Sequence, residues 1–157
     1  MENHNDEVTS VLNDLVRINN DRIEGYQRAL SETSDSDVDM KAMFNKMSDQ
    51  SRKYVTELVE EVGRLGGDAA KDTTASGKIY RVWMDLKAAI TGKDRQSIIA
   101  SCEYGEDVAQ RAYEAALESD ALQSSNVRQM VMEQKSSLKE SHDMIKAYRD
   151  MHDKIKS

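Results

Sequence analysis

The stretch GGDAAKDTTASGKIYRVWMDLKAAITGK, residues 66–93, decides how two pairs of predicted helices are connected. Apolar residues recur every three or four positions over residues 5–31, 36–65, 94–119 and 124–154, which is the spacing of amphipathic helices. Within each pair the link is short and polar, so the two helices should run antiparallel. The link between the pairs is long enough to follow the whole bundle, which predicts that the second and third long helices run parallel.

Turn and cap signals support these boundaries. SETSDSD at residues 31–37 is rich in residues that favour caps and turns, and the glycine pair 66–67 is a C-cap signal. Inside the long link, residues 78–90 repeat the helical spacing and predict a short extra helix that Trp83 attaches to the bundle. Two hairpins joined by such a crossover form the ferritin-like topology. An up-down-up-down bundle with a helical excursion is the alternative, and the length of the link favours the crossover.

The composition agrees with a single all-α domain over residues 1–157. The chain has no proline, 38% apolar residues and 32% charged residues, which suits long helices with one buried stripe. Its net charge is −7 with acids and bases interspersed, so we expect no nucleic-acid partner. No apolar run approaches the roughly 20 residues that span a bilayer, so we expect no membrane partner. A polar, acidic N-terminus and a single cysteine predict a cytoplasmic protein.

Several polar side chains fall on the apolar faces of the predicted helices. At about 100° per residue, Glu103 and Glu106 share the face that carries Cys102 and Tyr113 in the third long helix. Folding the helices about their loops brings the inward polar groups of all four to mid-bundle, where a buried polar layer must satisfy its own members. The residues predicted for this layer are Asn19, Arg22, Glu103, Glu106, Gln110, Gln134 and His142.

Four motifs resemble a known family. They occur in that family's order, cover nearly the whole chain and read DRIEGYQRAL (21–30), ELVEEVGRLGG (57–67), YRVWMDLKAAITGKD (80–94) and CEYGEDVAQRAYEAAL (102–117). The chain is similar to small bacterial four-helix-bundle proteins of unknown function within the ferritin-like superfamily. The resemblance implies the crossover bundle and brings no established activity. In that family a histidine often precedes the arginine of the third motif, which is Arg81 here. This chain has Tyr80 at that position, so any role of the histidine is not expected in this protein.

The wider superfamily implies a carboxylate-bridged di-iron site, which needs a glutamate from each of two helices and a Glu-x-x-His pair from each of the others. The fourth long helix supplies His142 but no matching glutamate, and the first has Arg22 where an inward glutamate would be wanted. Glu57 lies only at the margin of its helix's apolar stripe. The metal-binding alternative, with iron or manganese, therefore rests on Glu57, Glu103, Glu106 and His142.

Arg22 favours a different interpretation of the layer. A guanidinium stays charged and repels a divalent cation, whereas it pairs strongly with carboxylates. We therefore predict a metal-free network in which Arg22 neutralises Glu103 and Glu106, most simply as a bidentate contact to one of them. The other polar residues of the layer would hydrogen-bond to this group.

Three functions remain open at this stage. The first is a non-enzymatic bundle without a cofactor, which acts through its surface or by self-association. A stress-related role and a homo-oligomer follow only by analogy with ferritin-like relatives. The alternative is a metal-dependent oxidase or iron-handling protein, and the third is a small-molecule site at the polar layer.

Overall fold

The computed structural model describes residues 2–72, 95–123 and 126–156. These residues form four long helices and one turn of 3-10 helix, and none of them is in a strand. The all-α prediction is confirmed, with each long helix beginning and ending within a few residues of its predicted bounds. The predicted crossover helix 78–90, with Tyr80 and Trp83, lies outside the described residues. The elements are α1 (Glu2–Glu32), α2 (Val38–Arg64), α4 (Arg95–Glu118), η1 (Asp120–Leu122) and α5 (Arg128–Lys156).

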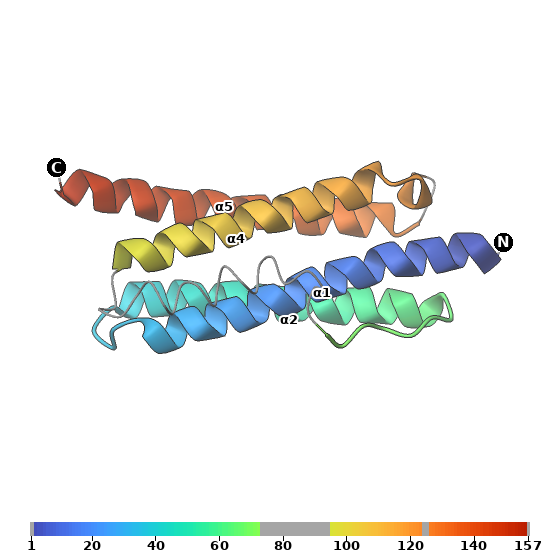
Figure 1. Cartoon of the computed structure of the whole chain (residues 1–157), viewed down its shortest axis with the longest axis horizontal. Coiled ribbons are helices and arrows are strands. Elements are labelled where there is room, and N and C mark those ends of the chain that lie inside the picture. The colour runs from blue at the N-terminus through green and yellow to red at the C-terminus, as the bar shows by residue number, and fades with distance from the viewer. Residues whose placement is uncertain (1, 73–94, 124–125, 157) are drawn as a thin grey trace.

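The helices form two antiparallel hairpins, α1 with α2 and α4 with α5 (Figure 1). Helix α2 ends at one end of the bundle and α4 begins at the other, so the two run in the same direction (Figure 1). The chain between them must return along the length of the bundle. The predicted crossover connection is therefore confirmed, and the up-down-up-down alternative is wrong.

Local capping explains where α2 begins and ends. The Asp37 carboxylate accepts a hydrogen bond from Met40 N at the first turn. At the other end, Gly66 has a φ of +80°, a left-handed conformation that glycine adopts without strain. Gly66 N donates to Gly63 O, and Gly67 N donates to Val62 O, both at 3.0 Å. These two bonds form a Schellman motif, which satisfies carbonyls that the helix leaves unpaired.

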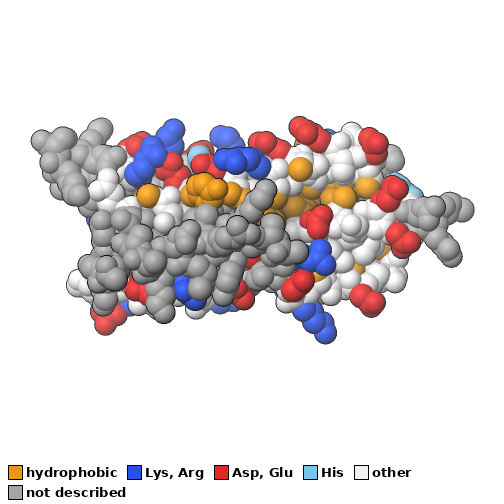
Figure 2. Space-filling model, in the orientation of Figure 1, with side chains coloured by type: hydrophobic (Ala, Val, Ile, Leu, Met, Phe, Trp, Pro, Cys, Tyr) orange, Lys and Arg blue, Asp and Glu red, His pale blue; other side chains and the backbone are white. Residues whose placement is uncertain are grey.

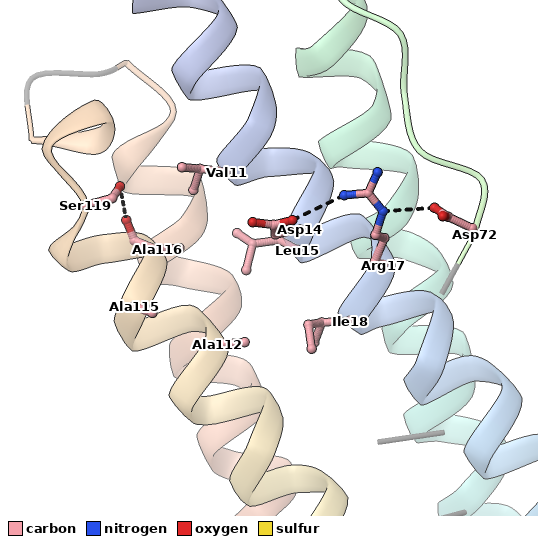
Figure 3. Close-up of a pocket in the computed structure, with 10 residues that line it drawn as sticks. All are labelled: Val11, Asp14, Leu15, Arg17, Ile18, Asp72, Ala112, Ala115, Ala116 and Ser119. Atoms are coloured by element: carbon pink, nitrogen blue, oxygen red, sulfur yellow. Dashed lines mark hydrogen bonds and ion pairs between the residues drawn. The ribbon is translucent and has the colours of Figure 1, made fainter. Parts of the chain in front are cut away.

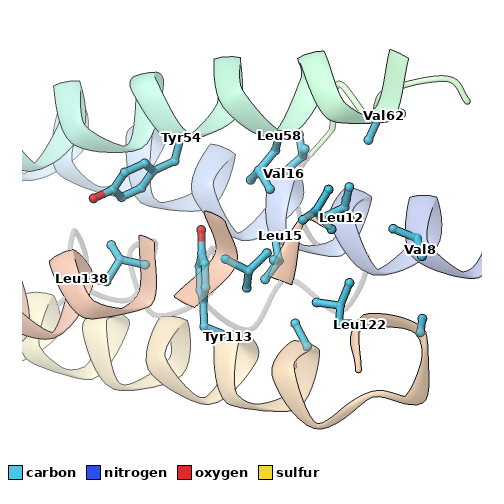
Figure 4. Packing of buried hydrophobic residues seen from close by; sticks show 14 residues of the cluster. Val8, Leu12, Leu15, Val16, Tyr54, Leu58, Val62, Tyr113, Leu122 and Leu138 are labelled. Atoms are coloured by element: carbon cyan, nitrogen blue, oxygen red, sulfur yellow. The ribbon is translucent and has the colours of Figure 1, made fainter. Parts of the chain in front are cut away.

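Two apolar clusters fill the bundle. One lies around Tyr26 and Phe44, whose ring centroids are 5.7 Å apart. The other contains Leu12, Leu58 and Leu138, and Figure 4 shows its side chains from all four helices meeting between them. Each fully buried leucine contributes about 1.5–3 kcal/mol of hydrophobic stabilisation. The one cysteine, Cys102, is free, so no disulfide links the described helices and these apolar clusters hold them together.

An extended segment after α2, residues 67–72, is fastened to the outside of α1 by side chains at helical spacing. Asn13 donates to Asp68 O at 2.9 Å and accepts from Ala70 N at 2.8 Å. One and two turns further, Arg17 binds the Asp72 carboxylate and Asn20 donates to Asp72 O, each at 2.9 Å. The ladder directs the chain back along α1 at the start of the crossover. Sequence reasoning did not identify it, because polar residues on an outer helix face are ordinarily solvated.

The described surface is charged and mixed. Figure 2 shows acidic and basic side chains interspersed on one face, with a line of hydrophobic side chains between them. No helix among the described residues carries an apolar stretch that would cross a bilayer.

The Asn13 contacts give a test of the ladder. We expect Asn13→Ala to lower the free energy of unfolding by about 1 kcal/mol, because two backbone groups lose their partner. Urea denaturation followed by circular dichroism measures this change. Asn45→Ala, on the exposed face of α2, is the matched control and should leave the midpoint unchanged. Equal midpoints for both variants would show that the ladder does not stabilise the fold.

Candidate functional site

The centre of the site is an ion pair between Arg22 of α1 and Glu106 of α4, both with fully buried side chains. Arg22 Nη2 and Nε lie 2.7 and 2.8 Å from the same oxygen, Glu106 Oε1. The Tyr26 hydroxyl donates to that oxygen as well, at 2.5 Å. The Arg22 guanidinium also lies 5.3 Å from the centroid of the Tyr26 ring, a cation–π distance. One carboxylate oxygen therefore collects three donors.

The remaining nitrogen of Arg22 connects α1 to α2. Arg22 Nη1 donates to Ser51 Oγ at 2.6 Å, and Ser51 Oγ donates to Asn19 Oδ1 at 2.9 Å. On the other side, Nη2 lies 3.8 Å from Met47 Sδ. The guanidinium thus has a polar partner on each of its three nitrogens, which is the condition for burying a charge without a large penalty.

The network continues from Asn19 across the bundle. Asn19 Nδ2 donates to the Tyr113 hydroxyl at 2.9 Å and to Leu15 O at 2.8 Å. The Tyr113 hydroxyl donates to Gln134 Oε1 at 2.6 Å, and Gln134 Nε2 donates to Glu57 Oε1 at 3.0 Å. An unbroken path of hydrogen bonds therefore crosses all four long helices. We call this set the polar layer, and its members are Asn19, Arg22, Tyr26, Ser51, Glu57, Glu106, Tyr113 and Gln134.

Burial and charge fix the protonation of several groups in the layer. Burial by itself lowers the pKa of Arg22, but the Glu106 carboxylate and the Tyr26 and Tyr113 phenols together more than offset it, so the net pKa lies above the usual value. Burial raises the pKa of Tyr26 well above its usual value, and the Glu106 charge adds to this. Burial likewise raises the pKa of Tyr113. Both phenols therefore stay protonated and act as donors at neutral pH.

Glu103 does not join this layer, which corrects the prediction that Arg22 neutralises both glutamates. Its Oε1 lies 2.5 Å from Nη1 of Arg149 in α5, and its side chain is 17% exposed. Of the two glutamates, Arg22 contacts only Glu106, and both hydrogen bonds to that carboxylate go to one oxygen instead of two. The pairing with Arg149 was missed because that arginine lies about two turns beyond His142, the last residue of α5 that was assigned to the layer.

Gln110 and His142 also lie outside the polar layer. Gln110 donates to Lys135 O at 3.2 Å and so joins α4 to the backbone of α5. His142 Nε2 lies 2.6 Å from Asp107 Oδ1, and its Nδ1 lies 3.3 Å from Asp143 Oδ1. His142 is only partly buried, because α5 carries it to the edge of the seam with α4. The prediction that these two side chains complete the layer is therefore wrong.

Three members of the polar layer were not predicted as site residues. Tyr26 and Tyr113 lie in the apolar stripes, where sequence analysis counts them as core, and Ser51 is a small polar residue on the buried face of α2. The signal that identifies them is the polar tip of a buried tyrosine, which needs a hydrogen-bond partner. Such a tip on the same face as Arg22 or Asn19 is a candidate for the same network.

The four residues of the metal-binding alternative do not meet in this structure. Among residues 2–72, 95–123 and 126–156, no group of three or more His, Cys, Asp or Glu side chains is placed to hold a metal ion. Each of the four already has a different partner, so the donor set does not fit a di-iron site. The pairs are Glu57 with Gln134, Glu103 with Arg149, Glu106 with Arg22, and His142 with Asp107.

The ion pair yields a stability prediction. We expect Arg22→Ala to lower the free energy of unfolding by about 3–5 kcal/mol, because the Glu106 carboxylate is left buried without its counter-charge. Arg52→Ala is the control: Arg52 pairs with Asp49 at the surface, and its removal should cost less than about 1 kcal/mol. Thermal and urea melts at neutral pH measure both. Similar losses for the two variants would contradict the central role of the pair.

The two buried phenols predict a decline in stability at alkaline pH. A tyrosine in the unfolded chain has a pKa of about 10. In the folded chain the pKa values of Tyr26 and Tyr113 are higher, so both side chains keep their protons to higher pH. The unfolded chain releases protons first, so the free energy of unfolding falls as the pH rises above about 10. Combining Tyr26→Phe with Tyr113→Phe should make this decline shallower between about pH 9 and about pH 11.

The exposed Tyr104 provides the control for this effect. Tyr104→Phe should follow the same pH profile as the unmodified protein in urea melts. An unchanged slope in the double variant would count against buried, protonated phenols.

Comparisons with known proteins agree with this architecture. A structure of a mutant of Mycobacterium smegmatis Dps1 matches with a TM-score of 0.79 and 14% identity, over 95% of this chain and 99% of that chain. At this identity the likeness shows a shared ferritin-like fold. No curated protein matches the chain. A family model described as Domain of unknown function (DUF2383) matches residues 7–119. Because this match covers most of the sequence, the chain belongs to the DUF2383 family, a family of unknown function with the ferritin-like fold.

Proposed function

We propose that this protein is a non-enzymatic ferritin-like bundle in which the polar layer replaces a di-iron site. The observation that carries the proposal is the Arg22–Glu106 pair, with both side chains fully buried. A permanent positive charge occupies mid-bundle, where a di-iron protein of this fold would place carboxylates and metal. The layer then serves to join the four helices, and the protein acts through its surface.

The charge balance supports this proposal. Glu103 and Glu106 are each paired with one arginine, Arg149 and Arg22, so neither needs a metal ion for neutralisation. An iron or manganese ion on Glu106 would lie beside the buried Arg22 guanidinium, which stays charged and repels a divalent cation.

A metal-binding function is the second candidate, because one observation favours it. Glu103 Oε2 and Glu106 Oε2 are both buried, and neither has a hydrogen-bond partner among the described residues. The two glutamates are three positions apart on α4, so their side chains leave the helix on neighbouring positions of one face. Two unpaired carboxylate oxygens of this kind are ligands that iron and manganese accept.

The proposal also includes a homo-oligomer in the cytoplasm, with a role in stress. Closed symmetric oligomers are common among soluble homomeric proteins, and the overall fold is shared with Dps1. The net charge of −7 supports a role without nucleic acid. Analytical ultracentrifugation of the purified chain measures the oligomeric state directly.

Metal loading tests the two candidates against each other. We expect aerobic incubation with Fe(II) or Mn(II), followed by desalting and elemental analysis, to leave substoichiometric metal on the protein, with iron oxidation at the rate of the buffer. Stoichiometric metal that is retained by the unmodified chain and lost in Glu106→Gln would overturn the proposal. Glu24→Gln, on the exposed face of α1, is the matched control for charge.

A further inference from the structure

A groove between α1 and α4 is lined by residues that do not belong to the polar layer. It encloses about 770 Å³. Figure 3 shows branched side chains of α1 pointing toward a wall of small side chains on α4. The apolar residues that line it are Val11, Leu15, Ile18, Ala112, Ala115 and Ala116.

The groove exists because one wall is built from alanines. Where Ala112, Ala115 and Ala116 face α1, the side chains are too short to fill the space between two helices. Leu15, Ile18 and Ala116 are already buried, whereas Val11, Ala112 and Ala115 keep exposed surface. Covering that exposed surface with a ligand releases water and favours binding by about 25 cal/mol per Å². The volume of the groove falls within the range of roughly 300–1,000 Å³ that is usual for small-molecule sites.

The length of the groove favours a small molecule over a docked helix. On α1 the lining extends from Val11 to Ile18, and on α4 from Ala112 to Ser119. Each wall covers seven steps of helix, or about 10 Å. A ligand with a short apolar body fits this length, whereas a docked helix of several turns would extend beyond both ends.

The charges at the rim indicate which ligand the groove accepts. Arg17 lies between two acids: its Nη1 is 3.2 Å from Asp14 Oδ1, and its Nε is 2.9 Å from Asp72 Oδ1. The acid side chains are 71% and 67% exposed, whereas that of Arg17 is 33% exposed. The hydrogen bond from Arg17 also lowers the pKa of Asp72, which keeps that group ionised. Among the described residues, the rim therefore carries a net negative charge, and its acids are the more accessible groups.

An anionic ligand would meet these acids before it reached Arg17 and would have to displace one of them. A cation is instead attracted to the exposed carboxylates. The overall charge of −7 adds a long-range attraction of the same sign.

We propose that this groove binds a small amphipathic amine. Its apolar body lies between Val11 of α1 and the alanines Ala112 and Ala115 of α4, and its protonated amine lies at the rim beside Asp14 and Asp72. Nothing in the polar layer has to move, so the site is independent of the function proposed above.

Phenylbutylamine is a suitable probe, with phenylbutanol and phenylbutyrate as neutral and anionic controls of similar size. We expect calorimetry on the full chain to show amine binding at least about tenfold tighter than binding of either control, from the charge at the rim. Methyl NMR should show the shifts at Ala112, Ala115 and Ala116. Failure of the amine to bind at millimolar concentration, or equally tight binding of phenylbutyrate, would overturn the proposal.

Two sets of variants locate the site. Ala115→Trp fills the groove from a position whose side chain is exposed, and we expect it to abolish amine binding, whereas Ala100→Trp on the same helix should retain it. Combining Asp14→Asn with Asp72→Asn should remove the preference for the amine over the alcohol. If Ala115→Trp does not fold, this surface pair still tests the role of the charge. Amine binding unaffected by either change would refute the site.

Self-association is the competing use of the groove. If Ala115→Trp dissociates an oligomer and the unmodified protein binds no amine, then the groove is occupied by a second copy of the chain and the small-molecule proposal is wrong. Sedimentation velocity on the same samples distinguishes the two outcomes.

Discussion

The buried pair of Arg22 and Glu106 is the constraint on which the middle of this bundle depends. Two full charges lie out of contact with water, and each would be very costly alone. Tyr26 and Ser51 lower that cost by hydrogen-bonding to the pair, and Ser51 in turn orients Asn19. The positions of these neighbours follow from the need to satisfy one guanidinium and one carboxylate in an apolar interior.

This requirement also bears on the register of the helices. The apolar clusters on either side of the layer are held by contacts that are largely non-directional, and a helix could slide along them at modest cost. Hydrogen bonds are directional, and a shift by one turn would leave Arg22, Asn19 and Gln134 buried without partners. A fully connected polar network therefore favours one alignment of the four helices over its neighbours.

The same pair also distinguishes this protein from metal-binding proteins that share its fold. A four-helix bundle of this topology can place carboxylates and histidines inward around metal ions, but the fold by itself does not supply the ligands. Here one inward position carries Arg22, and the only histidine near mid-bundle, His142, pairs with Asp107 at the edge of the α4–α5 seam. Function must therefore be argued from the site and the surface, including the groove between α1 and α4.

The sequence by itself determined the helices, their caps and the crossover connection, because these depend on local spacing, on turn residues and on the length of a link. It also determined that Arg22, Asn19 and Glu106 face inward, since helical periodicity places them on the apolar stripes. Only the tertiary structure decided which carboxylate Arg22 meets and that Glu103 pairs with Arg149 instead. The physical reason is that partner choice depends on differences of one turn in helix height and on side-chain reach, and neither is encoded in the periodicity of a single helix. The tyrosine hydroxyls entered the layer for the same reason: their rings follow the apolar pattern, and only packing shows where their polar tips end.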